Sequence, residues 1–458
     1  MIKCRSKLPH LQLKESYSSN SRYSRKMSRE NVTDEREPPD IERNEPAKFP
    51  DGGLRAWLVV VGAFFGLFTS FGWTNCVGIF QAYYQTHQLR TMSASTVSWI
   101  PGISMFMMFI TTLTQLNDNL QGPFVGRLFD AYGPRWLLLI GSLLHVFGLL
   151  MASFASRYYQ FILSQSICSP LGASMVLYSS FNCVATWFRE KRALAMGITA
   201  SGSSLGGVVM PILVDHIIDR NGFGWAMRIC ALFMLALLVV TNLTVRSRLR
   251  PHPTTLTLTS YLKNFTDIPF VLVTLASFFY SMGMFIPITY IVTYGQHVGM
   301  RTSLAGYLVS IFNAASGIGR VLPGYAADKI GNFNISICAA ALSTVFVLGL
   351  WLPGHSQATA IVFAATFGFS SGTYTALSPA LVAQISDIRE IGTRSGALYA
   401  FMSISALVGS PIGGSLIAKA HGEYWKLQVF TGMMLAGGTL FYSATRFRLT
   451  KGKAWVKV

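Results

Sequence analysis

One arginine stands inside an apolar stretch of the chain, where a charge is costly to bury. Arg320 precedes Asp328 by eight residues, so on a helix it lies about 12 Å from the polar end of its segment. The residue one helical turn before it is Ser316, and no acid follows before Asp328. A guanidinium in such surroundings needs a partner. We predict that Arg320 anchors an anionic ligand through a bidentate contact; the alternative is a structural role, bonded only to Asn313 or backbone carbonyls.

Two acidic turns recur at half the length of the chain. Residues 126–133 and 324–331 share the spacing Gly-x3-Asp-x2-Gly, with their aspartates 198 residues apart. An aspartate at such a turn stabilises the positive N-terminal end of a neighbouring helix. We predict that Asp130 lies beside Gly392, Thr393 and Arg394, and that Asp328 lies beside the residues from Arg189 to Arg192. The charges of this predicted gate belong to Asp130, Arg135, Arg192, Asp328 and Arg394.

The sequence lacks the patterns of enzymatic, metal-binding and nucleotide-binding sites. It holds no GxxxxGK[ST] loop, G-x-S-x-G elbow, C-x2-C pair or H-x3-H pair, and its six cysteines and eight histidines are dispersed. The glycine-rich runs 202–207 and 409–414 lie within apolar segments, where glycines more often let helices approach closely. We therefore expect neither an enzyme nor a cofactor, metal or nucleotide site.

Composition indicates an integral protein of the lipid bilayer. Of the 458 residues, 51% are hydrophobic and 12% are charged, and residues 1–50 alone hold 19 of the 56 charges. A chain so poor in charge cannot cover a water-facing surface, since soluble domains carry about 25% charged residues. The net charge of +18 does not indicate nucleic-acid binding, because the basic residues cluster at the ends of apolar segments.

Apolar runs of membrane-spanning length divide the chain into two halves. We predict a disordered cytosolic tail over 1–50, a six-helix bundle over 51–245, a cytosolic linker over 246–266, a second six-helix bundle over 267–447 and a tail over 448–458. The predicted fold is an all-α membrane protein with twelve transmembrane helices in two pseudo-symmetric bundles. The runs lie near 51–82, 95–116, 136–155, 159–187, 193–214, 223–245, 268–294, 303–326, 333–352, 357–385, 395–418 and 426–445.

The distribution of basic residues predicts the orientation. If the amino terminus lies inside, interior loops hold twelve Lys and Arg residues and exterior loops hold six. Basic residues favour the cytosolic side. We therefore expect both termini and both acidic turns to face the cytosol, most simply at the plasma membrane.

The half-length repeat and the turn around Asp130 resemble the major facilitator superfamily. Two further stretches are similar to its monocarboxylate transporter-like family, particularly the fungal branch: Asp51-Gly-Gly-Leu-Arg-Ala-Trp57 and the junction from Thr186 to Gly202. The resemblance covers roughly 51–447. It implies a secondary transporter working by alternating access, with helices 1, 4, 7 and 10 lining the path, and an arginine of helix 8 that binds carboxylate substrates.

The chain departs from that family in three places. Ser316 stands where monocarboxylate carriers place an Asp, and helix 1 lacks a lysine, so coupling to protons stays open. Asp215 or His145 could titrate instead, although a helix end and lipid-facing packing are the favoured interpretations. The predicted helix 2 contains additional polar residues over 111–121, which are too polar to face lipid. The helix could be broken there to line a cavity, the residues could be an insertion, or a splice error could have entered the translation; the insertion is the favoured interpretation.

Polar side chains inside the predicted helices are candidate ligand contacts, although each one alone is more often packing. The predicted function is transport of a small organic anion, carboxylate or other metabolite, and a planar organic acid or heterocycle suits such a cavity. Uptake of a nutrient and efflux of a secondary metabolite both stay open, and a non-transporting sensor is disfavoured by the short tail and linker. The predicted substrate-binding residues are Arg320, Asn75, Tyr178, Tyr280, Asn313 and Tyr374.

Overall fold

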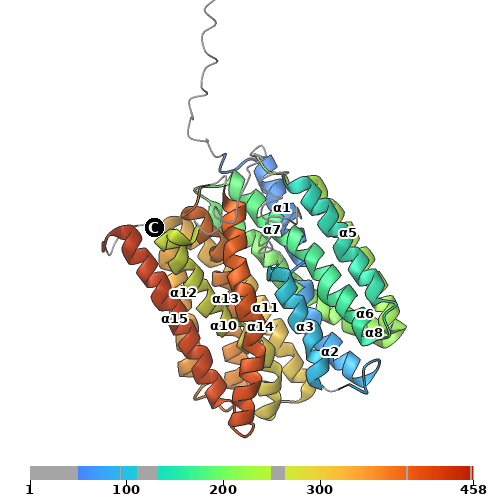
Figure 1. Ribbon diagram of the computed structural model, residues 1–458. Helices are drawn as coiled ribbons and strands as arrows, with labels where there is room; N and C mark the ends of the chain where they lie inside the picture. The colour runs from blue at the N-terminus through green and yellow to red at the C-terminus, as the bar shows by residue number, and fades with distance from the viewer. Residues whose placement is uncertain are drawn as a thin grey trace, which may run out of the picture. The chain divides into compact units, whose positions relative to one another are not determined.

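The computed structural model describes residues 50–92, 94–110, 133–248, 264–387, 390–453 and 456. They belong to one unit, Phe49–Val458, and every regular element among them is helical (Figure 1). The predictions for the first 49 residues, for the polar run 111–121, for Asp130 and for most of the linker concern residues outside these ranges.

The first half of the chain is built around a broken first helix and a very long last one. Helix α1 ends at Thr69, the backbone turns at Ser70 (φ −87°, ψ −82°), and the chain resumes as η1. At Gly72 the chain passes so close to α8 that an added Cβ would lie 2.9 Å from the Cα of Gly206. The elements are α1 (Leu54–Thr69), η1 (Trp73–Cys76), α2 (Val77–Thr86), α3 (Ala94–Ile110), α5 (Pro134–Ala152), α6 (Tyr158–Phe161), η2 (Ile162–Cys168), α7 (Ser169–Trp187) and α8 (Arg192–Thr244).

Helix α8 is two helices joined end to end. Its 53 residues contain one non-helical position, Gly222 (φ 77°, ψ 165°), which divides it into 192–221 and 223–244. This left-handed conformation suits a residue without a Cβ. The predicted fifth and sixth helices are therefore both present, and the first of them continues to 221 rather than ending near 214.

The second half continues with long helices. Its elements are η3 (Asn264–Thr266), α10 (Ile268–His297), α11 (Thr302–Ile330), α12 (Asn332–Phe346), η4 (Val347–Trp351), α13 (Gln357–Gln384), α14 (Ile391–Lys419) and α15 (Trp425–Thr450).

Eight helical stretches within the described ranges are long and apolar enough to cross a membrane, α8 counted once. Helices α11 and α15 have 29 and 26 residues but do not qualify by composition. Arg320 and Asp328 lie in the first of them, and Arg446 and Arg448 in the second. The count of twelve spans stays a prediction, whereas the all-helical architecture is as expected.

Several pairs of helices join the halves of the chain. Helix α3 packs beside α14 (Figure 1). Helix α8 packs against α11 and α13, and α7 touches α13 and α14. The contact between α8 and α11, which we call the α8–α11 seam, comprises residues 193–207 of α8 and 313–328 of α11. Glycines bring the two backbones together there: a Cβ added at Gly197 would overlap the carbonyl oxygen of Arg320, and one at Gly324 would lie 2.7 Å from that of Ala193. The polar side chains of the seam therefore face each other at short range.

Candidate functional site

Arg320 lies in the middle of the α8–α11 seam and is only 4% exposed. Its Nη1 donates to the carbonyl oxygen of Ala200 at 2.5 Å and to the hydroxyl of Ser203. No carboxylate pairs with it among the described residues, and its Nε has no acceptor. The structure thus shows a buried guanidinium that is bonded across the two halves but is not neutralised by any described side chain.

A second unpartnered polar group lies on α8, next to the Ser203 that Arg320 contacts. Ser204 is 2% exposed, and its hydroxyl has no hydrogen-bond partner. It faces the backbone of α11, where a Cβ on Gly317 would lie 3.3 Å from the Cβ of Ser204. Buried polar groups in proteins are nearly always hydrogen-bonded. The residues of the seam therefore include three unpartnered polar groups, the Nε of Arg320 and the hydroxyls of Thr199 and Ser204, and a polar ligand that reached Arg320 and Ser204 would satisfy two of them.

Asn75 of η1 and Asn313 of α11 meet beside Gly207, at one end of the seam. Asn313 lies two helical turns from Arg320 along α11. Asn313 donates from Nδ2 to Oδ1 of Asn75 at 3.1 Å and to the carbonyl oxygen of Val309 at 3.0 Å. Asn75 lies in η1 at the break of the first helix and donates from Nδ2 to the carbonyl oxygens of Phe71 and Gly72. The structure brings these two predicted site residues together.

Tyr178 is buried where α7 meets α14. Its hydroxyl donates to the carbonyl oxygen of Met108 at 3.3 Å, and its ring centre lies 4.7 Å from that of Tyr399. Tyr399 in turn stacks on Phe109 of α3 at 6.2 Å. Sequence reasoning identified Tyr178 but missed Tyr399, because that tyrosine carries no spacing signal of its own.

Tyr280 and Tyr374 lie together in the interior of the second half. Their ring centres are 4.1 Å apart, and both are buried. The hydroxyl of Tyr280 bonds that of Ser343 at 2.7 Å, and the hydroxyl of Tyr374 bonds that of Ser281 at 3.0 Å. Their hydroxyl groups are thus satisfied within the bundle of the second half.

The carboxylate of Asp328, a residue of α11, lies against the start of α8. Its two oxygens accept from the backbone N–H groups of Ala193 and Leu194, each at 2.9 Å. These groups lack partners within their own helix, and the helix dipole favours negative charge there. Asp328 therefore bonds the two residues that directly follow the predicted neighbours Arg189 to Arg192, and its role in gating stays a prediction.

The other predicted gate residues have separate surroundings. Arg192 is 8% exposed and donates to the carbonyl oxygens of Phe188 and Ala383. Arg394 forms an ion pair with Asp267 at 2.9 Å. Arg135 is exposed at the start of α5. Asp130 lies outside the described residues, and its contact with Gly392, Thr393 and Arg394 stays a prediction.

A second acid at the start of α8 was missed. The Oδ1 of Asp51 accepts from the backbone N–H groups of Arg189 at 2.5 Å and Glu190 at 2.7 Å, in the turn that leads into α8. Asp51 has a left-handed backbone (φ 47°), which is uncommon outside glycine. The stretch opening at Asp51 and the junction from Thr186 to Gly202 were recognised separately, and the structure shows that they are in contact.

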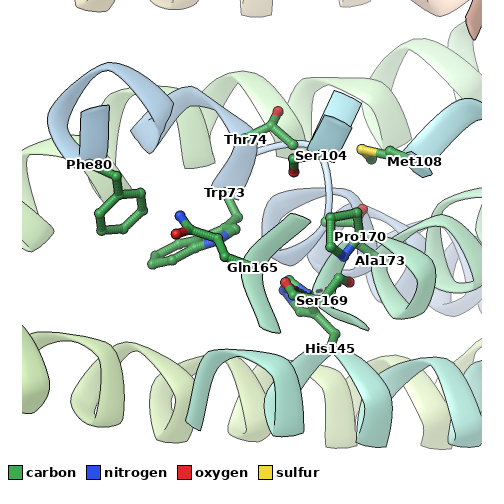
Figure 2. A pocket seen from close by; sticks show the side chains of 11 residues that line it. Trp73, Thr74, Phe80, Ser104, Met108, His145, Gln165, Ser169, Pro170 and Ala173 are labelled. Atoms are coloured by element: carbon green, nitrogen blue, oxygen red, sulfur yellow. Dashed lines mark hydrogen bonds between the residues drawn. The ribbon is translucent and has the colours of Figure 1, made fainter. Parts of the chain in front are cut away.

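His145 corrects an expectation from the sequence. It is 1% exposed and lies inside the first half rather than facing lipid (Figure 2). Its Nε2 is 3.0 Å from the carbonyl oxygen of Thr69, which ends α1, and its Nδ1 is 2.9 Å from the hydroxyl of Ser169. Gln165 and Trp73 line the same small pocket (Figure 2). His145 thus bonds a carbonyl group at the break in the first helix.

No group of three or more His, Cys, Asp or Glu residues that could hold a metal ion occurs in the part of the chain that the structure describes. The donors of the seam are instead a guanidinium, hydroxyls and carboxamides. Such a set suits an organic solute that carries negative charge and hydrogen-bonding groups.

Comparison with known proteins gives a consistent family. The model of the Major Facilitator Superfamily matches residues 62–367 and 273–457. An MFS-type transporter of Gibberella moniliformis is 66% identical over 92% of this chain and 98% of its own length. The fujikurins efflux protein of Gibberella fujikuroi is 41% identical over 88% of this chain and 84% of its own. A crystal structure of FucP in the outward conformation has the same fold, with a TM-score of 0.67 at 13% identity, covering 85% of this chain and 98% of that one.

Proposed function

The chain belongs to the Major Facilitator Superfamily, and from this membership we propose that it exports a small organic anion across the plasma membrane by alternating access. It is a multi-pass membrane protein that transports a small organic solute. The anionic nature of the solute, the outward direction and the membrane are the proposal.

The proposal rests on Arg320, which is buried and is not paired with any described carboxylate. A charge buried without a neutralising partner is expensive, and a carrier of neutral solutes would have little reason to keep one at the contact between its halves. An entering carboxylate would find the unused Nε of Arg320 and the unpartnered hydroxyl of Ser204. Hydrogen bonds to charged groups contribute about 1.5–3 kcal/mol each, more than neutral ones.

The outward direction is supported by relatives rather than by geometry. The 41% identical fujikurins efflux protein bears an export function in its name. The excess of basic residues in the loops predicted to be interior supports cytosolic termini. In that orientation, Asp328 at the start of α8 would hold the cytosolic side closed.

Alternating access requires the two bundles, predicted over 51–245 and 267–447, to rock about the seam. The proposed gate comprises Asp328 and Arg192 at the start of α8, with Asp130, Arg135 and Arg394 as the counterpart on the other side of the repeat. Placement in the monocarboxylate transporter-like branch is part of the proposal, and the contact of Asp51 with the turn before α8 supports it.

The test is counterflow into proteoliposomes that contain the purified full-length protein. Labelled aromatic carboxylates are compared with their neutral primary amides. Arg320→Gln should lower carboxylate counterflow roughly 10- to 100-fold and affect the amides less, because the lost contact is charge-assisted. Arg228→Gln, which removes a half-buried arginine that lies 4.6 Å from the ring of Phe154, is the matched control.

Equal losses for charged and neutral solutes would return Arg320 to a structural role. Direction is measured separately, in cells preloaded with a transported acid. Faster release from cells that express the protein supports export, whereas faster accumulation overturns it.

A further inference from the structure

We propose that the exported anion also carries an amide or lactam group, and that Asn313 recognises this group in place of Asn75. The inference rests on the proposed function, because it assumes that Arg320 holds the anionic end of the solute. It adds a second chemical group to the solute and assigns that group to one residue.

The orientation of both carboxamides is set by their neighbours. Asn75 lies against the carbonyl oxygens of Phe71 and Gly72, and Asn313 lies against that of Val309. Only the NH2 side of a carboxamide can donate to a carbonyl group. The Oδ1 of Asn75 therefore faces the Nδ2 of Asn313, and the two side chains are joined by one hydrogen bond at 3.1 Å.

Asn313 keeps an unused acceptor beside that bond. Its Oδ1 accepts no hydrogen bond from any described residue, although the side chain is only 3% exposed. A Cβ placed on Gly207 would come within 2.6 Å of this oxygen and 2.9 Å of the Nδ2 of Asn75. Because Gly207 has no side chain, the carboxamides of Asn75 and Asn313 fit between the helices at this point, and a Cβ there would overlap them.

Rocking of the halves breaks this pair in one of the two states. Asn75 belongs to the first half and Asn313 to the second, so separation at this level leaves Asn313 without its partner. An unmade hydrogen bond in a buried site is costly. A ligand with a cis-amide or lactam group replaces the lost hydrogen bond. Its C=O accepts from Nδ2 of Asn313, while its N–H donates to the Oδ1 of Asn313.

The spacing to Arg320 sets the shape of the solute. Asn313 and Arg320 are seven residues apart on α11, which is close to two full turns, so they share one face about 10 Å apart along the helix axis. The inferred solute is therefore an extended molecule with an anionic group at one end and an amide or lactam some way along it.

Two labelled carboxylates that differ in one atom test the inference. 5-(6-Oxopiperidin-2-yl)pentanoate carries a lactam, whose ring holds the N–H and the C=O on the same side, and 5-(6-oxooxan-2-yl)pentanoate replaces this N–H with the ring oxygen of a cyclic ester. Counterflow of both is measured in proteoliposomes containing the full-length protein. The lactam should compete more tightly, by roughly 3- to 10-fold in half-saturating concentration, since one neutral hydrogen bond distinguishes the probes. Asn313→Ala should bring the ratio of the two half-saturating concentrations close to one.

Two further variants separate recognition from packing. Asn242→Ala removes a carboxamide that bonds Ser142 at 2.8 Å, away from the seam, and should keep the preference for the amide. Asn75→Ala removes the internal competitor of the ligand and should keep or increase the preference. If Asn313→Ala does not fold, this Asn75 result alone decides: loss of the preference there overturns the assignment to Asn313.

The failures are distinguishable. If the protein transports both probes with equal half-saturating concentrations, or if the preference survives in Asn313→Ala, the amide inference is wrong and anion export stands. If neither probe nor any other carboxylate enters, the proposed function itself is wrong.

Discussion

The bond between Asp328 and the start of α8 should set the balance between the two conformations of the carrier. Its carboxylate accepts two backbone N–H groups at 2.9 Å from the opposite half. In Asp328→Asn the charge is lost and an NH2 group faces one of the two N–H groups. Charge-assisted bonds contribute about 1.5–3 kcal/mol each when buried. Asp328 is half-buried, so water reduces this contribution, and we expect a loss of roughly 1–2 kcal/mol.

A loss of this size corresponds to a 5- to 30-fold shift toward the state that is open to the cytosol. The assay is labelling of Ser204→Cys by a membrane-impermeant maleimide, in inside-out vesicles and in a background without the six native cysteines. Labelling should accelerate by that factor when Asp328→Asn is added. Asp219→Asn, an exposed acid in α8, is the matched control. An unchanged labelling rate at equal protein abundance would refute the role of Asp328 as a latch.

Three further substitutions have expected outcomes that thermal unfolding of the purified protein can check. Asp51→Ala leaves the N–H groups before α8 without their cap and should cost about 1–2 kcal/mol, with a smaller effect for Asp51→Asn; an unchanged midpoint contradicts the cap. His145→Leu leaves the carbonyl group of Thr69 unpartnered and should cost about 1–3 kcal/mol; a neutral effect would favour the lipid-facing interpretation. Gly197→Ala places a Cβ against the carbonyl group of Arg320 and should lower the unfolding midpoint and reduce transport. A normal midpoint and normal transport would show that α8 and α11 are further apart than the structure places them.

Two features of the sequence allowed part of the fold to be predicted: the charged residues inside apolar segments and the repeated glycine-containing turn. Asp328 could be placed at the start of α8 because an acid in a repeated turn has few other partners in a membrane protein. The depth of Arg320 followed from counting residues along one helix. Its actual partners, Ala200 and Ser203, could not be read from the sequence, because they depend on how closely Gly197 lets the two helices approach.

The errors and omissions concern contacts between distant segments. His145 was expected to face lipid; its neighbours Leu143 and Phe147, two residues away on either side, are indeed exposed. Its own side chain points inward, to a carbonyl group at the break after Thr69, and that break has no signature in residue type. The role of Asp51 was missed for a similar reason, since its partners are backbone N–H groups 138 and 139 residues away.

The central claim, that Arg320 holds the anionic end of the solute, is tested most directly by equilibrium binding. The dissociation constant of the lactam 5-(6-oxopiperidin-2-yl)pentanoate is measured for the purified full-length protein and for Arg320→Gln and Arg320→Lys. We expect roughly 10- to 100-fold weaker binding for Arg320→Gln and an intermediate loss for Arg320→Lys, which keeps the charge but not the bidentate geometry. Equal dissociation constants for all three folded proteins would contradict the account.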